Sequence, residues 1–217
     1  SEDYVDFLSP SGYVPLLPEL WHLAFEAELR GQGSVAGFVQ AASDLIHEKF
    51  RYVKGATHVH SSIRDSLALG AGVCQDFAHL LLAVVRTRGL PARYVSGYLV
   101  PESAAGPEAR LEEVIGGQAS HAWVEVYMPA SGWVPFDPTL GKPVGLRHVR
   151  IAYGRDYGDA APMRGVYRGQ SGQRLSVDVS VRPALDDEGH ERVRDIPQPA
   201  SEAALVSVRP QQPQQQQ

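Results

Sequence analysis

Apolar residues in the first half of the chain recur every three or four positions, in three long stretches and one short one. This spacing is typical of helices that bury one face. Ser34 is a suitable N-cap for the second stretch, and Gly89, with Pro91 just beyond it, is a C-terminal signal for the last. The pattern therefore predicts helices over residues 18–30, 35–50, 63–69 and 74–88.

The second half changes to the alternating pattern of strands, separated by segments rich in proline and glycine. Residues 129–132 (PASG) predict a turn between two of these strands. Because helices come first and strands later, the order favours an α+β fold with a mostly antiparallel sheet. Strands are expected over residues 92–100, 119–127, 133–137, 146–152 and 174–181.

One predicted strand, residues 119–127, carries two different faces. His121, Trp123, Glu125 and Tyr127 share one face, while small and apolar residues occupy the other. The second face is ordinary core. The first is too polar and bulky for that, so we expect it to border a cleft.

A hairpin around residues 129–132 brings this face close to the next strand. If Tyr127 pairs with Ser131, then His121 lies directly opposite Asp137. Residues opposed in this way are within side-chain hydrogen-bonding reach. We therefore expect His121 and Asp137 to interact.

Composition excludes several classes of function. The chain has 217 residues, of which 43% are hydrophobic and 21% charged, and its formal net charge is −5. These values are ordinary for a soluble globular protein, and no basic excess indicates nucleic-acid binding. The longest apolar run, residues 80–85, is far shorter than a membrane span. We expect neither a nucleic-acid nor a membrane partner.

The ends of the chain suggest its organisation. It begins at Ser1, with no initiator methionine or signal region, so we expect a piece of a longer protein. Acidic residues, prolines and finally glutamines dominate after Pro183, which predicts one domain over residues 1–183 and a mobile tail over residues 184–217. A single unpaired cysteine is consistent with a reducing compartment, and we expect a cytoplasmic location.

Cys74 is the only cysteine, and it lies where the last predicted helix begins. Glycines at 70 and 72 bring the backbone in tightly before it. A helix N-terminus offers free N–H groups and partial positive charge, which favour a thiolate. Since no internal disulfide is available, packing, metal binding and nucleophilic chemistry remain.

Nucleophilic chemistry needs a base that accepts the thiol proton and a third group that orients the base. His121 and Asp137 are the candidates for these roles, and Trp123, on the face of His121, is the candidate substrate contact. The carboxylate of Asp76 is expected to bind backbone or another side chain and to be structural.

Two other interpretations of these residues stay open. A lone cysteine is often a small buried hydrophobe. Zinc binding by Cys74 and His121 would need a further histidine, for which His58, His60 and His79 are available. Because the chain has no CxxC or HExxH spacing, we expect no metal and no other cofactor.

Four segments in this order resemble the core of the bacterial transglutaminase-like superfamily: GVCQDFA at 72–78, GLPARYVSGY at 89–98, HAWVEV at 121–126 and WVPFDPT at 133–139. Two later stretches, at 148–157 and 164–169, are also similar to these proteins. The resemblance covers roughly residues 4–182.

The resemblance implies a papain-like α+β fold and a catalytic triad of Cys74, His121 and Asp137. The implied reaction is acyl transfer at a peptide or protein amide through a thioester, with hydrolysis slightly favoured over transamidation. The backbone N–H of Cys74 is a candidate oxyanion donor, and the second donor is unassigned. Many of these bacterial proteins carry an extra β-rich region before the helical part, so the resemblance implies such an N-terminal region in the full-length protein. The alternative is an inactive member of the superfamily that serves as a binding module.

Overall fold

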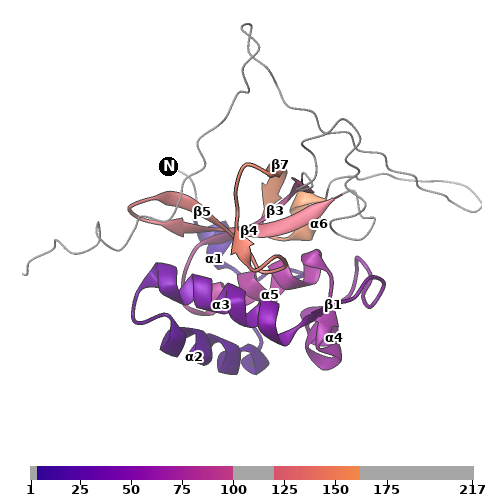
Figure 1. The fold of residues 1–217 in the computed structure, drawn as a ribbon, viewed down its shortest axis with the longest axis horizontal. Helices are drawn as coiled ribbons and strands as arrows, with labels where there is room; N and C mark the ends of the chain where they lie inside the picture. The colour runs from indigo at the N-terminus through magenta and orange to yellow at the C-terminus, as the bar shows by residue number, and fades with distance from the viewer. Residues whose placement is uncertain (1–3, 100–119, 162–217) are drawn as a thin grey trace, which may run out of the picture.

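A computed structural model of the protein describes residues 4–99 and 120–161 (Figure 1). The predicted strand over 174–181 and the predicted tail over 184–217 lie outside the described residues, and so does the boundary between the two predicted domains.

The helices follow the apolar pattern closely. All four predicted helices are present, and each ends within a few residues of its expected bounds. A short helix in the lead-in was not predicted. The helices are α1 (Val5–Leu8), the 3-10 helix η1 (Pro18–Leu20), α2 (Trp21–Arg30), α3 (Val35–Lys49), α4 (Ile63–Leu69), α5 (Cys74–Thr87) and α6 (Tyr157–Ala160).

Local side-chain caps explain where two helices begin. The Ser34 side chain accepts a hydrogen bond from the backbone N–H of Gly37 and caps α3, as predicted. Ser62 and Asp65 form a capping box at α4. Gly89 adopts a positive φ of 69° directly after α5, a conformation that favours glycine.

In the part of the chain that the structure describes, five strands form one sheet in which every neighbouring pair is antiparallel, in the order β6-β5-β4-β3-β7. A separate two-stranded parallel pair, β1 with β2, was not predicted. The strands are β1 (Arg51–Tyr52), β2 (Ala71–Gly72), β3 (Ala92–Leu99), β4 (His121–Met128), β5 (Gly132–Asp137), β6 (Lys142–Pro143) and β7 (His148–Gly154).

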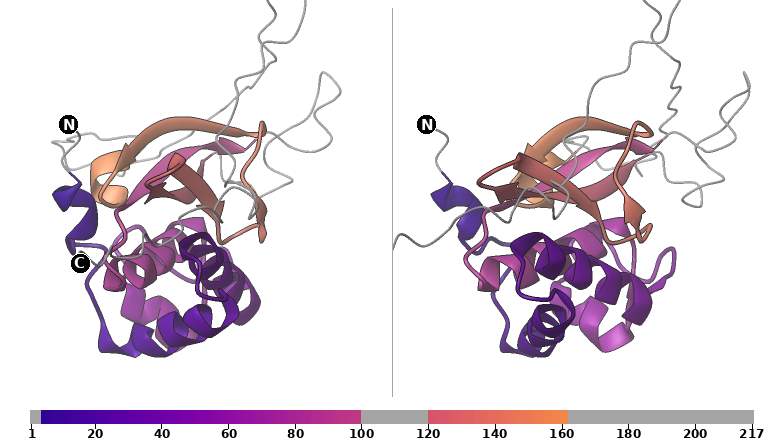
Figure 2. Two further views of the ribbon diagram at one scale, coloured as in Figure 1. Left: turned by 90° about the vertical axis from the view of Figure 1, so that its left-hand side faces the viewer. Right: turned by 60° about the vertical axis from the view of Figure 1, so that its left-hand side comes forward.

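The described residues form two layers, with the helices α2 to α5 on one face of the sheet (Figures 1 and 2). Helix α5 contacts β3 and β4 on one side and α2 and α3 on the other. Twelve of its residues are buried. Because α5 is covered on both sides, its sequence is apolar almost all round. Cys74 lies at the N-terminal end of this central helix.

The predicted hairpin register is wrong by two residues. Tyr127 pairs with Trp133 rather than Ser131, and Val124 with Phe136. Residues 129–131 form the loop, and Gly132, at a φ of 73°, is the first residue of β5. A three-residue loop of this kind is common when glycine supplies the positive φ. Since the shift is even, Asp137 keeps the face that it shares with His121.

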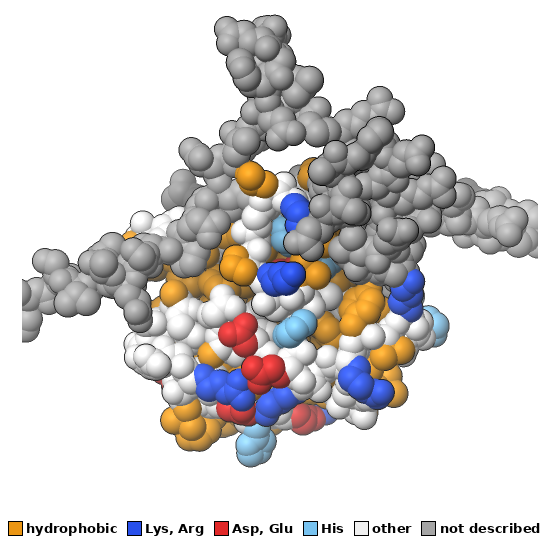
Figure 3. Space-filling view, in the orientation of Figure 1, with side chains coloured by type: hydrophobic (Ala, Val, Ile, Leu, Met, Phe, Trp, Pro, Cys, Tyr) orange, Lys and Arg blue, Asp and Glu red, His pale blue; other side chains and the backbone are white. Residues whose placement is uncertain are grey.

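Oppositely charged side chains lie side by side over α2 and α3 (Figure 3). Arg30 pairs with Glu26 and Glu48, and Lys49 also pairs with Glu26. Within the described ranges no helix is long and apolar enough to cross a membrane.

Candidate functional site

Cys74 begins α5, and the side chain of Asp76 fixes that start. The Asp76 carboxylate accepts from the backbone N–H of Val73 at 2.8 Å and from the Thr57 hydroxyl at 2.5 Å. Gly72 leaves the room for this carboxylate, since a Cβ there would lie 2.8 Å from the Asp76 side chain. The expectation that Asp76 is structural agrees with these contacts.

His121 and Asp137 are joined by a hydrogen bond of 2.6 Å between Nε2 and Oδ2. Both side chains are fully buried. The other carboxylate oxygen, Oδ1, accepts from the backbone N–H groups of Thr139 and Leu140. The predicted interaction is therefore present, although the two residues are not directly opposed in the sheet.

Electrostatics favour a charged pair. Burial by itself lowers the pKa of His121, but the hydrogen bond and charge of Asp137, with a smaller contribution from Cys74, raise the pKa to about 10. Burial by itself raises the pKa of Asp137, and the hydrogen bonds and charges of His121 and then His148 bring it well below its usual range. The imidazolium of His121 is thus stabilised in the folded protein.

The ring of His121 has one nitrogen left for Cys74. Nε2 is committed to Asp137, while Nδ1 is buried and makes no aligned hydrogen bond among the described residues. Cys74 acts on the pKa of the ring, so its sulfur lies nearby. Proton exchange between sulfur and Nδ1 is therefore the chemistry that this pair can perform.

Cys74 and His121 line one cavity of about 110 Å³. Three segments surround them: residues 57–59, the start of α5 with Val73, and the sheet residues near His121. Gln75 ties the first segment in place by donating to the carbonyl of Val59. The lining residues are Thr57, His58, Val59, Val73, Cys74, Gln75, Asp76, Tyr94, Ser96, Ser120, His121, Ala122 and Tyr157.

Trp123 is not among the residues that line this cavity. Its side chain is 2% exposed and packs with Val95 and Val144, while its ring contacts His121 and His148. The expected cleft therefore lies beside this strand face at His121, while Val144 and His148 cover the face at Trp123. The contacts of Trp123 are those of a packing residue behind the two imidazoles.

A second histidine, His148, also contacts the carboxylate of Asp137 and was not predicted from the sequence. His148 Nε2 lies 3.0 Å from Asp137 Oδ2, and the side chain of His148 is 4% exposed. The signal for it was its place within the predicted strand over residues 146–152. Pairing of β7 with β3, which brings His148 opposite Leu99, is a tertiary contact that the local pattern does not carry.

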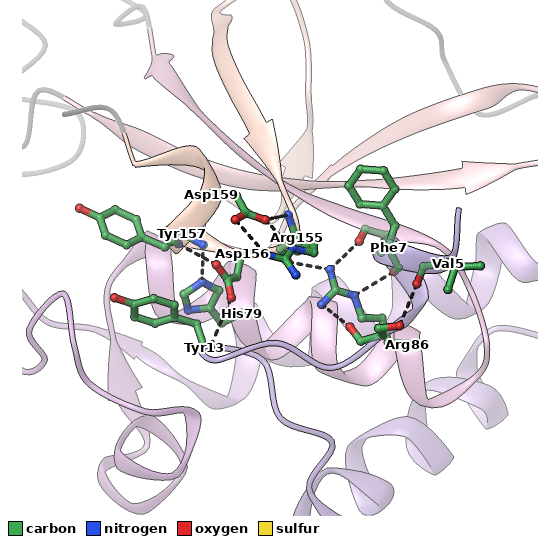
Figure 4. Close-up of polar contacts among 12 residues, drawn as sticks. Val5, Phe7, Tyr13, His79, Arg86, Arg155, Asp156, Tyr157 and Asp159 are labelled. Atoms are coloured by element: carbon green, nitrogen blue, oxygen red, sulfur yellow. Dashed lines mark hydrogen bonds and ion pairs between the residues drawn. The ribbon is translucent and has the colours of Figure 1, made fainter. Parts of the chain in front are cut away.

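A second polar cluster supports the cavity wall at Tyr157 (Figure 4). The backbone N–H of Tyr157 donates to Nε2 of buried His79. Burial lowers the pKa of His79 to about 3, with the charge of Asp156 opposing the shift. The Asp156 carboxylate in turn accepts from the backbone N–H of Tyr13, so the lead-in segment is tied to the wall.

Among the described residues, the histidines considered for a zinc site do not converge with Cys74. His58 lines the same cavity but is exposed, His60 is exposed, and His79 accepts from the backbone N–H of Tyr157. The ligand atoms that do converge in the described part of the chain belong to His121, Asp137 and His148, and they lie within 4.8 Å of one another. Hydrogen bonds already join them, so a metal ion here would have to displace both bonds.

Comparison with known proteins identifies the family. The model of the transglutaminase-like superfamily matches residues 24–138, which include all three proposed triad residues. An uncharacterised protein of Mycobacterium leprae is 36% identical over 81% of this chain and 60% of its own length. A protein-glutamine gamma-glutamyltransferase of Pseudomonas aeruginosa is 32% identical over 52% of this chain and 16% of its own length.

Among solved structures, a candidate cysteine protease from Cytophaga hutchinsonii is 34% identical, with a TM-score of 0.55. The match covers 74% of this chain and 50% of that one. The chain thus spans about half to three fifths of the length of the mycobacterial relatives and of this structure. By its sequence match and its fold, the chain belongs to the transglutaminase-like superfamily.

Proposed function

We propose that the protein is a cysteine-dependent acyl-transfer enzyme that acts on a peptide or protein amide, with Cys74, His121 and Asp137 as its catalytic triad. The observation that carries the proposal is that His121, which is hydrogen-bonded to buried Asp137, lines the same cavity as Cys74. Nucleophile, base and orienting group are the three parts that such chemistry requires.

In the first half-reaction, the Cys74 thiol gives its proton to Nδ1 of His121, and the thiolate attacks the amide carbonyl carbon. The C=O electron pair moves to oxygen. As the first residue of α5, Cys74 has a backbone N–H without an intrahelical acceptor, and this group can donate to the oxyanion. The oxyanion collapses, the C–N bond breaks, and His121 returns the proton to the leaving nitrogen. A thioester remains on Cys74.

In the second half-reaction, His121 removes a proton from water or from an amine, which attacks the thioester carbonyl. The C–S bond breaks, and the proton restores the Cys74 thiol. Water gives hydrolysis, and an amine gives transamidation. We favour hydrolysis, as the candidate protease from Cytophaga hutchinsonii supports, whereas the Pseudomonas aeruginosa relative supports transamidation.

Incubation with a glutamine-containing peptide and a labelled primary amine tests the proposal. Hydrolysis releases ammonia without incorporating amine, while transamidation releases ammonia and incorporates it. Cleavage of the peptide backbone is read in parallel by mass spectrometry. Cys74→Ala should abolish whichever activity is found, and its circular dichroism spectrum should match that of the wild type.

An inactive member of the superfamily that acts as a binding module is the alternative. It predicts no glutamine hydrolysis, no transamidation and no cleavage of the peptide backbone. The same result is expected with the peptide and with casein, which serves as a broad protein substrate. It also predicts that no acyl group accumulates on Cys74 when an activated ester is supplied. The cytoplasmic location remains a prediction.

A further inference from the structure

We propose that His148 is a positioning residue of the reaction, which holds the carboxylate of Asp137 in the orientation that His121 requires. The inference rests on the proposed function, because it assigns His148 a role within the same triad. The juxtaposition that carries it is a chain of three buried side chains, His148, Asp137 and His121, joined through one oxygen atom.

The hydrogen bonds of His148 define its tautomer. The backbone N–H of Gly145 donates to Nδ1 of His148 at 3.3 Å, so Nδ1 is the acceptor nitrogen of the neutral ring. The proton of that ring then resides on Nε2, the nitrogen that lies 3.0 Å from Asp137 Oδ2. His148 is therefore oriented to donate to the carboxylate.

Within the described ranges, the carboxylate receives four donors. Oδ1 accepts from the backbone N–H groups of Thr139 and Leu140, and Oδ2 accepts from His121 and His148. Without His148, Oδ2 would be held by His121 alone, and that is the residue it must orient. His148 lies outside the triad, so it holds Asp137 Oδ2 in place whether or not His121 has accepted the proton from Cys74.

The backbone near His148 lets strand β7 and the Trp123 ring pack closely together. Strand β7 pairs with β3, with a register shift between Ser96 and Gly97. A Cβ at Gly97 would lie 2.1 Å from the carbonyl oxygen of Val149 and 2.7 Å from the Trp123 ring. The glycine thus allows β7 and Trp123 to close around the histidine. Trp123 contacts both imidazoles, which limits their rotation.

The first test is the pH dependence of Cys74 alkylation by iodoacetamide, which needs no substrate. His148→Leu removes the donor, and His148→Gln keeps an N–H group at the end of a side chain of similar reach. We expect His148→Leu to slow alkylation at pH 6 by about tenfold, in line with the effect of outer partners that orient metal-binding imidazoles, and His148→Gln to restore most of the rate.

His47→Leu is the matched control. The exposed ring of His47 binds the carbonyl of Thr139, in the loop that follows Asp137, but does not contact the carboxylate. This variant should keep the wild-type pH profile. A wild-type profile for His148→Leu, or equal losses in His148→Leu and His148→Gln, would overturn the inference.

A double variant separates this inference from the proposed function. Asp137→Asn should itself lower the rate at pH 6, and adding His148→Leu should then change it less than about twofold, since His148 acts through the carboxylate. If Asp137→Asn has no effect, the triad and the role of His148 both fail. If Asp137→Asn lowers the rate but His148→Leu does not, only the role of His148 fails.

A measurement on the unmodified protein is independent of folding in the variants. Imidazole ¹⁵N shifts of His148 should report a proton fixed on Nε2 at neutral pH. A proton on Nδ1, or two equivalent averaged nitrogens, would contradict the proposed hydrogen bond to Asp137.

Discussion

Asp137 is held tightly in the candidate site, because each of its two oxygens accepts two hydrogen bonds from the described residues. A carboxylate held in this way can favour one tautomer of His121 and the imidazolium that forms when sulfur loses its proton. A substitution that keeps the shape of Asp137 and removes its charge can therefore test its role in the reaction without disturbing the packing.

Asp137→Asn should lower the rate of acyl transfer by roughly 10²- to 10⁴-fold while the protein stays folded, because the amide keeps the shape but loses the charge. The rate of ammonia release or peptide cleavage measures this. Asp44→Asn is the control, since among the described residues that carboxylate accepts from the side-chain amide of Gln40 on the surface of α3. A loss in both variants, or in neither, would contradict the role given to Asp137.

The lowered pKa of His79 predicts that the stability of the protein depends on pH. Its pKa is about 3 in the folded protein, against an ordinary value near 6.5, so the unfolded chain binds more protons between these values. The contribution of neutral His79 to the free energy of unfolding is therefore fully present above pH 6.5. It falls as the pH drops towards 3, by up to about 1.4 kcal/mol per pH unit. Tyr13, Tyr94 and Tyr157 surround the ring, with Asp156 and Arg86 as the nearby charges.

Urea unfolding of the wild type and of His79→Gln, at several pH values from 7 to 4, measures this contribution. The glutamine can still accept from Tyr157 but does not titrate in this range. The free-energy difference between the two proteins should therefore shift in favour of the variant as the pH falls. Parallel curves would show that His79 does not cause the effect.

At the scale of elements, local patterns predict helices and strands well, and contacts between distant elements poorly. Helix α5 is evident from its apolar residues, and Cys74 from its place at the helix start. The pairing of His121 with Asp137 was expected from a register that proved wrong by two, and survived because strand faces repeat every two residues. His148 was missed because β7 reaches Asp137 only through its pairing with β3.

Gly72→Ala tests how the start of α5 is held. The added Cβ would lie 2.8 Å from the Asp76 side chain, which must move away from the N–H of Val73 and from Thr57. We expect a loss of about 1–3 kcal/mol in the free energy of unfolding. In Gly12→Ala, where a Cβ meets no atom within 4 Å, unfolding should change little. Equal stabilities of the two variants would rule out this packing argument.

At the scale of the whole molecule, one buried arginine joins segments that are far apart in the sequence (Figure 4). Arg86, near the end of α5, donates to the carbonyls of Phe7, Ser9, Ala92 and Arg155. The four carbonyls come together only in the folded chain, so the sequence pattern does not reveal them.

Arg86→Met should therefore destabilise the protein by about 3 kcal/mol or more, because it removes four charge-assisted hydrogen bonds, one buried and three partly buried. Arg88→Met is the control: its exposed ion pair with Glu28 should contribute at most about 1 kcal/mol. Thermal and urea unfolding provide the comparison. A similar small loss in both variants would mean that Arg86 does not tie these segments together.

The most direct test of the account is the rate at which iodoacetamide alkylates Cys74 at pH 6, where an ordinary thiol is almost entirely protonated. The His121–Asp137 pair predicts a rate at least about tenfold above that of free cysteine at the same pH, and a fall towards the free rate in His121→Gln. A wild-type rate no faster than that of free cysteine would contradict the proposal that Cys74 is an activated nucleophile.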